Sequence, residues 1–206
     1  MSEIEGFILA GGASSRMGRD KARLSLGQKQ FVERIADALR HIADRLSLVG
    51  ARDPAAAWRW PNVPDVHKSW GALGGLHAAL KASRAPWAAV VACDLPFVTG
   101  ELFLRLAARR EGFDAVVPLQ MDGRRQPLCA LYRVSQCLDQ TEKLIAEGER
   151  RPRALLDKIR TRLVQPEELA DLEGAALFFS NINTPEDYEQ AKKGMSDEGG
   201  AMKGLE

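Results

Sequence analysis

The sequence predicts an α/β fold with a mostly parallel sheet and helices on both faces. Strand-like and helix-like patterns alternate along the chain, which is the arrangement of βα units around a parallel sheet. Residues Trp87–Ala92 form a nearly continuous apolar run, as expected of a central parallel strand buried on both faces. A glycine-rich loop follows the first strand, where open α/β sheets bind ligands. We therefore expect a three-layer, Rossmann-like domain.

The first half of the chain predicts three main strands and two helices. Apolar residues recur every three or four positions in the helical segments, and prolines and glycines separate the segments. The expected elements are strand Ile4–Ala10, a small hairpin within Ala22–Gln28, helix Phe31–Ala43, strand Arg45–Gly50, a loop over 51–70, helix Leu73–Ser83 and strand Trp87–Ala92.

The second half continues the alternation. Its expected elements are helix Glu101–Arg110, strand Ala115–Pro118, a turn at Met121–Arg124, strand Leu128–Tyr132, helices Val134–Glu147 and Arg153–Arg160, strands Leu163–Gln165 and Ala176–Phe179, and helix Pro185–Lys193. No linker divides the chain, so residues 1–194 are expected to form a single domain. Residues 195–206 are rich in glycine and charge and are expected to be a disordered tail.

Composition narrows the class of protein. A chain of 206 residues is long enough for one substantial core. The net charge of +1 argues against broad electrostatic binding to nucleic acid or to a membrane surface. No apolar run is long enough to span a bilayer, and no signal peptide is visible. The three cysteines have no disulfide pattern, so we expect a reduced, cytoplasmic protein.

The loop after the first strand carries glycines at 11, 12 and 18 together with Arg16, Arg19 and Lys21. Glycines allow backbone N–H groups to approach a ligand, and the cations supply charge opposite to an anion. A polyphosphate fits this combination best. The spacing matches neither a Walker A loop nor the dinucleotide-binding fingerprint. We expect the N–H groups of residues 11–13, with Arg16 and Lys21, to hold a triphosphate.

Asp94 follows the buried strand Trp87–Ala92 directly, and so lies at the same carboxyl edge of the sheet as the glycine loop. Mg²⁺ is bound in proteins through one or two carboxylates together with phosphate oxygens. Asp94 is therefore the predicted metal ligand. The alternative, a helix cap, is weaker because the next helix begins several residues later. Cys93 is interpreted as a buried packing residue.

The run Leu-Ala-Gly-Gly-Ala-Ser-Ser-Arg-Met-Gly-Arg-Asp-Lys at 9–21 resembles the signature of nucleotidyltransferases that activate a small molecule with an NTP. It is most similar to the molybdenum cofactor guanylyltransferases of the MobA type. The resemblance covers about Ile4 to Tyr188, and Cys-Asp-Leu-Pro at 93–96 matches the family's metal-binding segment. In this family, Gly11-Gly12 followed by Asp20-Lys21 goes with guanine rather than cytosine.

The resemblance implies further contacts. Leu9, Ala10 and Gly12 would contact the base largely through backbone groups, and Asp65 with Gly74 would lie against the guanosine. Asn183, in Asn-Ile-Asn-Thr-Pro at 181–185, is a candidate for the metal and pterin side of the site. Gln126 stands where the family usually has histidine, which weakens an acid–base role there. His67 is a candidate substrate contact, whereas His41 and His77 are expected to be ordinary helix residues.

The implied reaction is transfer of GMP from GTP to molybdopterin-bound molybdenum cofactor, with release of pyrophosphate. The implied partners are GTP, the molybdopterin cofactor, other proteins of cofactor synthesis and apo-molybdoenzymes. Two alternatives stay open: a related transferase using CTP or another phosphorylated acceptor, and a non-catalytic nucleotide-binding module. The basic run at 149–153 also has two interpretations, a solvated loop or a rim that attracts an anionic substrate.

Overall fold

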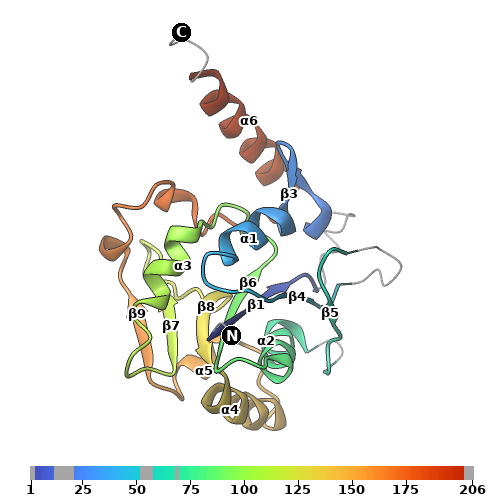
Figure 1. Cartoon of the computed structure of the whole chain (residues 1–206), viewed down its shortest axis with the longest axis vertical. Coiled ribbons are helices and arrows are strands. Elements are labelled where there is room, and N and C mark those ends of the chain that lie inside the picture. Colours follow the sequence, from blue (N-terminus) through green and yellow to red (C-terminus); the bar gives the residue numbers. More distant parts are fainter. Residues whose placement is uncertain (1–2, 12–20, 52–57, 68–69, 202–206) are drawn as a thin grey trace.

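A seven-stranded sheet crosses the middle of the molecule, in a computed structural model that describes residues 3–11, 21–51, 58–67 and 70–201, the stretch 195–201 as helix only (Figure 1). The strands lie in the order β5 (Asn62–Val63), β4 (Leu46–Val49), β1 (Ile4–Leu9), β6 (Trp87–Ala92), β8 (Cys129–Arg133), β7 (Ala115–Pro118) and β9 (Thr161–Val164). Only β8 runs antiparallel to its neighbours, β6 and β7. The prediction of a mostly parallel sheet is confirmed.

Helices cover both faces of the sheet, as the sequence predicted (Figure 1). One layer contains α1 (Phe31–Leu39) and α3 (Gly100–Ala107), and the other contains α2 (Gly71–Ala82), α4 (Val134–Ala146) and α5 (Arg153–Leu156). Side chains alternate between the layers along β1, because successive residues of a strand point to opposite faces. Ile8 packs with the first layer, and Phe7 and Leu9 pack with the second.

A hairpin and the last helix form a smaller unit beside the main core. Strands β2 (Ser25–Leu26) and β3 (Lys29–Gln30) pair around Gly27, whose φ of 61° suits glycine. Helix α6 (Pro185–Ala201) begins against this hairpin and then points away from the body (Figure 1). The hydroxyl of Tyr188 donates to the carbonyl of Ser25 at 2.7 Å. The helix therefore extends into the segment expected to be a disordered tail.

Several expected elements differ from the structure, among them α1, which ends at Leu39 rather than at the predicted Ala43. Residues 175–177 form a 3₁₀ turn rather than part of a strand, because Gly174 adopts a φ of 74° and its carbonyl accepts from Leu177 N at 2.8 Å. The expected loop at 51–70 contains β5, a two-residue edge strand between Pro61 and Pro64. Helix α5 ends at Leu156, well before the predicted Arg160. Within the residues described, no helix is long and apolar enough to cross a membrane.

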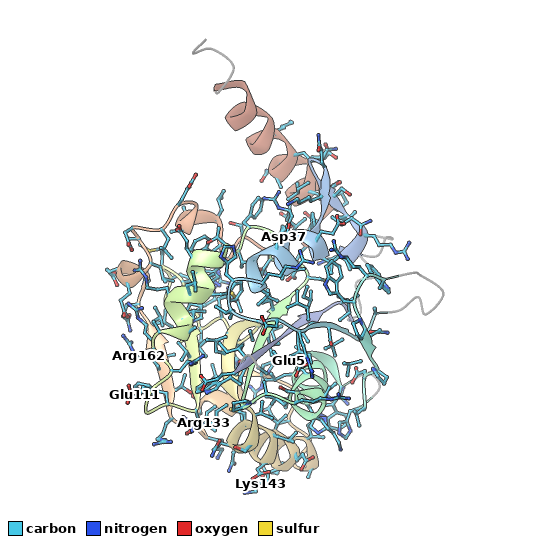
Figure 2. The ribbon with its side chains drawn as sticks, viewed as in Figure 1. Glu5, Asp37, Glu111, Arg133, Lys143 and Arg162 are labelled. Carbon is cyan, nitrogen blue, oxygen red and sulfur yellow. The ribbon has the colours of Figure 1, made fainter. Side chains whose placement is uncertain are left out.

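Charged side chains buried at the amino edge of the sheet serve structure. Glu5, labelled in Figure 2, lies within the body on β1 and is 8% exposed. Its carboxylate accepts from Arg84 N at 2.8 Å and from the Ser83 hydroxyl at 3.4 Å. Buried charge is tolerated when it is hydrogen-bonded in this way. Glu5 thereby fixes the turn between α2 and β6, at the opposite edge of the sheet from the predicted site.

Candidate active site

The carboxyl ends of β4, β1 and β6 are joined by hydrogen bonds just beyond the regular strands. The N–H groups of Ala10 and Gly11 both donate to the carbonyl of Val49, at 2.9 and 3.1 Å. Cys93 N donates to the Leu9 carbonyl at 3.1 Å. The N–H groups of Ala10 and Gly11 are therefore already donated within the sheet. The expectation that the Gly11 N–H helps to hold a triphosphate stays a prediction, and it would require this N–H to share or exchange its bond to Val49.

Gly11 has a different structural reason to be glycine. A Cβ on Gly11 would lie 2.9 Å from the carbonyl oxygen of Gly50 and 3.2 Å from its Cα. Gly50 itself has a φ of 68°, a left-handed conformation that favours glycine. These two glycines let the ends of β1 and β4 approach each other. The approach fixes where the chain leaves β1 toward the predicted phosphate loop.

Lys21, Asp94 and Asn183 come together at this edge, as the sequence predicted for one site. Lys21 begins the 3₁₀ turn Lys21–Arg23, and its Nζ donates to Asn183 Oδ1 at 2.7 Å. The same Nζ lies 3.9 Å from Asp94 Oδ2. The Lys21 and Asp94 side chains are only 11% and 22% exposed. Three segments far apart in sequence thus place a cation, a carboxylate and an amide together.

Asp94 is a partly desolvated carboxylate. Burial raises the pKa of Asp94 above its usual value, and the nearby positive charge of Lys21 opposes that rise. Its backbone is fixed, because the carbonyl of Asp94 accepts from Ile182 N at 3.0 Å. Such a carboxylate gains from a second nearby cation, which would stabilise its ionised form.

The segment that carries Asn183 is held by the cap of α6. Asp187 Oδ2 accepts from the N–H groups of Asn183 and Thr184, both at 2.9 Å, and Thr184 Oγ1 accepts from Asp187 N at 3.1 Å. These hydrogen bonds lower the pKa of Asp187. Ile182 is 2% exposed and packs with Phe31 beneath the hairpin. The helix cap therefore sets the position of the amide that receives Lys21.

The donor set at Asp94 fits a divalent cation shared with a bound phosphate. In the part of the chain that is described, no cluster of three or more histidine, cysteine, aspartate or glutamate residues could hold a metal alone. Mg²⁺ commonly uses one or two carboxylates and fills its other positions with phosphate oxygens and water. Asp94 alone, partly exposed at a strand end, meets that requirement.

Asp65 and Gly74 also lie together, where β5 ends and α2 begins. Asp65 Oδ1 accepts from His67 N at 3.2 Å, which closes a tight turn. A Cβ on Gly74 would lie 2.8 Å from Trp70 Cβ and 3.4 Å from Asp65 Oδ1. Gly74 therefore lets the first turn of α2 pack directly on this turn. The two predicted guanosine contacts belong to one compact unit.

Gln126 lies at the carboxyl end of β7, beside the start of β8. Its N–H donates to the carbonyl of Pro118 at 3.0 Å, and its carbonyl accepts from Cys129 N at 3.1 Å. Two residues later, the Leu128 carbonyl accepts from Ala92 N at 2.8 Å, which joins this segment to the end of β6. Gln126 thus lies at the same edge of the sheet as Asp94, between the end of β7 and the start of β8, and β8 is three strands away from β4.

The basic loop after α4 is attached to the start of α2, a contact the sequence did not predict. Trp70 Nε1 donates to the carbonyl of Glu149 at 2.8 Å, and the Arg150 guanidinium lies 4.8 Å from the centre of the Trp70 ring. Arg151 pairs with the Glu149 carboxylate at 2.6 Å, which helps lower the pKa of Glu149 to about 2. This loop borders an open hollow of about 790 Å³. The feature of the sequence that could have pointed to this contact is Trp70, which stands close to the glycines at the start of α2.

Some predicted site residues lie outside the described residues. Gly12, Ala13 and Arg16 fall within residues 12–20, so their expected contacts with base and phosphate stay predictions. Lys21, the last residue of the matched motif, is described and lies in the site.

The fold and this site define the class of protein. The sheet is mostly parallel, and its carboxyl edge carries Lys21, the partly buried Asp94 and the closely packed Gly11 and Gly50. This is the arrangement of an α/β nucleotidyltransferase. The chain belongs to the family of MobA-like NTP transferase domains, whose family model matches residues 6–164.

Relatives of similar length extend the match beyond that region. A probable molybdenum cofactor guanylyltransferase of Pelotomaculum thermopropionicum is 33% identical over 193 residues, covering 93% of each chain. One from Bacillus cereus is 32% identical over 205 residues, covering 96% of this chain and all of the relative.

Solved structures agree. Molybdopterin-guanine dinucleotide biosynthesis protein A from Archaeoglobus fulgidus superposes with a TM-score of 0.78 at 27% identity, covering 94% of this chain and 99% of that one. A 2-C-methyl-D-erythritol 4-phosphate cytidylyltransferase from Thermus thermophilus gives 0.66 at 20% identity, covering 92% and 97%. The second likeness concerns the fold alone.

Proposed function

We propose that this protein transfers GMP from GTP to molybdopterin-bound molybdenum cofactor, forms the guanine dinucleotide form of the cofactor and releases pyrophosphate. The observation that carries the proposal is the meeting of Lys21, Asp94 and Asn183 at the carboxyl edge of the sheet. Full-length similarity to guanylyltransferases supports the choice of substrate.

The reaction needs positioning and charge neutralisation rather than a protein nucleophile. An oxygen of the acceptor phosphate attacks the α-phosphorus of GTP in line, the bond to the β-phosphate oxygen breaks, and pyrophosphate leaves. Lys21 Nζ lies where it would neutralise charge on the phosphates, and Asn183 holds that ammonium in place. Asp94 would bind Mg²⁺, which when present neutralises phosphate charge.

The nucleotide and the acceptor would approach from different strands. In this proposal Leu9, Ala10, Gly12, Asp65 and Gly74 lie on the guanosine side, with Arg16 at the phosphates. Gln126 lies on the acceptor side, beyond β6. The guanine preference rests on Gly11-Gly12 and Asp20-Lys21 in the matched motif. Other proteins of cofactor synthesis and apo-molybdoenzymes are the proposed protein partners, in a reducing cytoplasm.

The test is a turnover assay that measures pyrophosphate release from each of the four NTPs, with molybdopterin-bound cofactor and Mg²⁺. We expect release with GTP, dependence on acceptor and Mg²⁺, and formation of the guanine dinucleotide. Release with CTP instead would assign a cytidylyltransferase. GTP binding without turnover under any acceptor condition would assign a non-catalytic module and overturn the proposal.

A further inference from the structure

His77 is a buried histidine inside α2 that the proposed reaction does not use. It is 1% exposed, and its Nδ1 is buried with no hydrogen-bond partner among the described residues. Its Nε2 lies 3.5 Å from Glu142 Oε1 on α4, at the long limit of a hydrogen bond. A neutral ring with its proton on Nε2 fits these contacts. Its Nε2–H faces the Glu142 carboxylate, and its Nδ1 carries no hydrogen, so no buried donor is left without an acceptor.

The His77 ring supports the turn that carries Asp65. Its centre lies 4.8 Å from the centre of the His67 ring, with the planes inclined at 59°. The backbone of His67 is part of the turn, because its N–H donates to Asp65 Oδ1 and its carbonyl accepts from Trp70 N at 3.0 Å. A displacement of His67 would therefore move both Asp65 and the start of α2.

A proton on His77 is unfavourable at this position. It would create a buried Nδ1–H donor without an acceptor among the described residues, and would place positive charge in a desolvated site. Among the residues that the structure describes, three ionisable groups act on the ring: His67 from the turn, Lys81 on α2 and Glu142 on α4. Burial lowers the pKa of His77, His67 and Lys81 lower it further, and Glu142 opposes them.

We propose that neutral His77 is a positioning residue for the guanosine-binding turn, and that its protonation releases the turn and weakens nucleotide binding. The inference rests on the proposed function, because it assumes that Asp65 and α2 face the nucleotide. The sign follows from linkage: the tight-binding form is fully present above the ordinary pKa of histidine. It is lost as pH falls through the lowered pKa of His77.

The test measures the Kd of GTP with Mg²⁺ from pH 5.5 to pH 8, with circular dichroism to confirm that each protein stays folded. Wild type should lose affinity progressively toward pH 5.5, by less than about tenfold there, because the pKa of His77 lies below its ordinary value. His77→Phe keeps a ring that cannot be protonated, so its loss should be clearly smaller. Comparing variants at each pH cancels the titration of GTP itself.

Two exposed neighbours give opposite shifts without changing the nucleotide site. Glu142 and Lys81 are 51% and 55% exposed. Glu142→Gln should move the loss of affinity to lower pH, because the carboxylate that stabilises the protonated ring is gone. Lys81→Gln should move it to higher pH. His41→Gln, on a histidine outside this cluster, should follow wild type.

The outcomes separate the two proposals. Opposite shifts for Glu142→Gln and Lys81→Gln support the role of His77. Curves for wild type, both surface variants and His77→Phe that coincide would overturn it while leaving the proposed function intact. Failure of the wild type to bind GTP at pH 7.5 would instead overturn the proposed function.

Discussion

At the scale of single residues, the site consists of a few charged and polar groups in a partly buried space. Lys21 has two acceptors within reach, the Asn183 amide at 2.7 Å and the Asp94 carboxylate at 3.9 Å. The hydrogen bond goes to the amide, so the carboxylate keeps oxygen atoms for another cation. This division of roles is consistent with the proposed Mg²⁺ site at Asp94.

Replacing Asp94 with Asn should strongly reduce turnover without unfolding the protein. We expect kcat to fall by a factor on the order of a hundred or more, because the variant would no longer hold the Mg²⁺ that neutralises phosphate charge. Burial raises the pKa of Asp94, so its ionisation opposes folding at neutral pH, and the melting temperature should hold or rise. Steady-state kinetics and thermal melting measure both. Asp37→Asn, which removes a carboxylate that is 40% exposed on α1, is the matched control.

Lys21 and Asn183 should behave as one unit in a double-mutant cycle. Lys21→Ala should chiefly weaken binding of the triphosphate, and Asn183→Ala should act mostly by freeing the lysine. The double variant should then be little worse than Lys21→Ala alone, with a coupling of about 0.5–3 kcal/mol in kcat/KM. Fully additive losses would show that Asn183 acts independently of Lys21, by contacting substrate.

At the scale of elements, the site is built where strands end. The ends of β4, β1 and β6 are linked by backbone hydrogen bonds, and α2 packs on the turn after β5 through Gly74. Glycine gives these contacts space that a Cβ would otherwise fill. The glycines of the matched motifs therefore report packing between elements as well as proximity to a ligand.

Gly11→Ala should destabilise the fold, whereas Gly75→Ala should not. The added methyl at Gly11 meets backbone of Gly50 at 2.9 Å, and we expect a cost of about 1–3 kcal/mol. At Gly75 the methyl meets the Leu9 side chain at an ordinary 3.5 Å, and alanine favours helix by up to about 1 kcal/mol. Urea unfolding measures both free energies. Equal effects would refute the close-approach explanation.

At the scale of the whole molecule, the last helix contributes through its first turns. Tyr188 and Ala191 pack against the hairpin cluster, and the cap at Thr184 positions Asn183. Beyond these turns α6 points away from the body (Figure 1). The site and the core thus depend on the beginning of α6.

A chain shortened to end at Gly194 should keep its stability and its site. It retains the cap, Tyr188 and Ala191, so we expect the melting temperature to change by less than about 2 °C. GTP affinity should match that of the full chain. A large loss of either would show that residues 195–206 belong to the domain, contrary to the single domain predicted for 1–194.

The sequence by itself determined the fold class, most element positions and three candidate residues that the structure brings together, Lys21, Asp94 and Asn183. Alternation and apolar runs record burial locally, which is why Trp87–Ala92 and Ala115–Pro118 were predicted with the bounds that the structure has. Short elements escaped this logic: β5 and the 3₁₀ turn at 175–177 depend on neighbours and on a left-handed glycine. Local patterns carry no information about such partners.

Only the tertiary structure decided how the predicted residues act. It showed that the Gly11 N–H is used within the sheet, that Asn183 receives Lys21, and that Trp70 joins the basic loop to α2. It also showed that His77, expected to be an ordinary helix residue, is buried against the ring of His67. Hydrogen-bond partners and burial arise from contacts between distant segments. The sequence pattern therefore identifies candidate site residues, and only the folded structure shows which groups they contact.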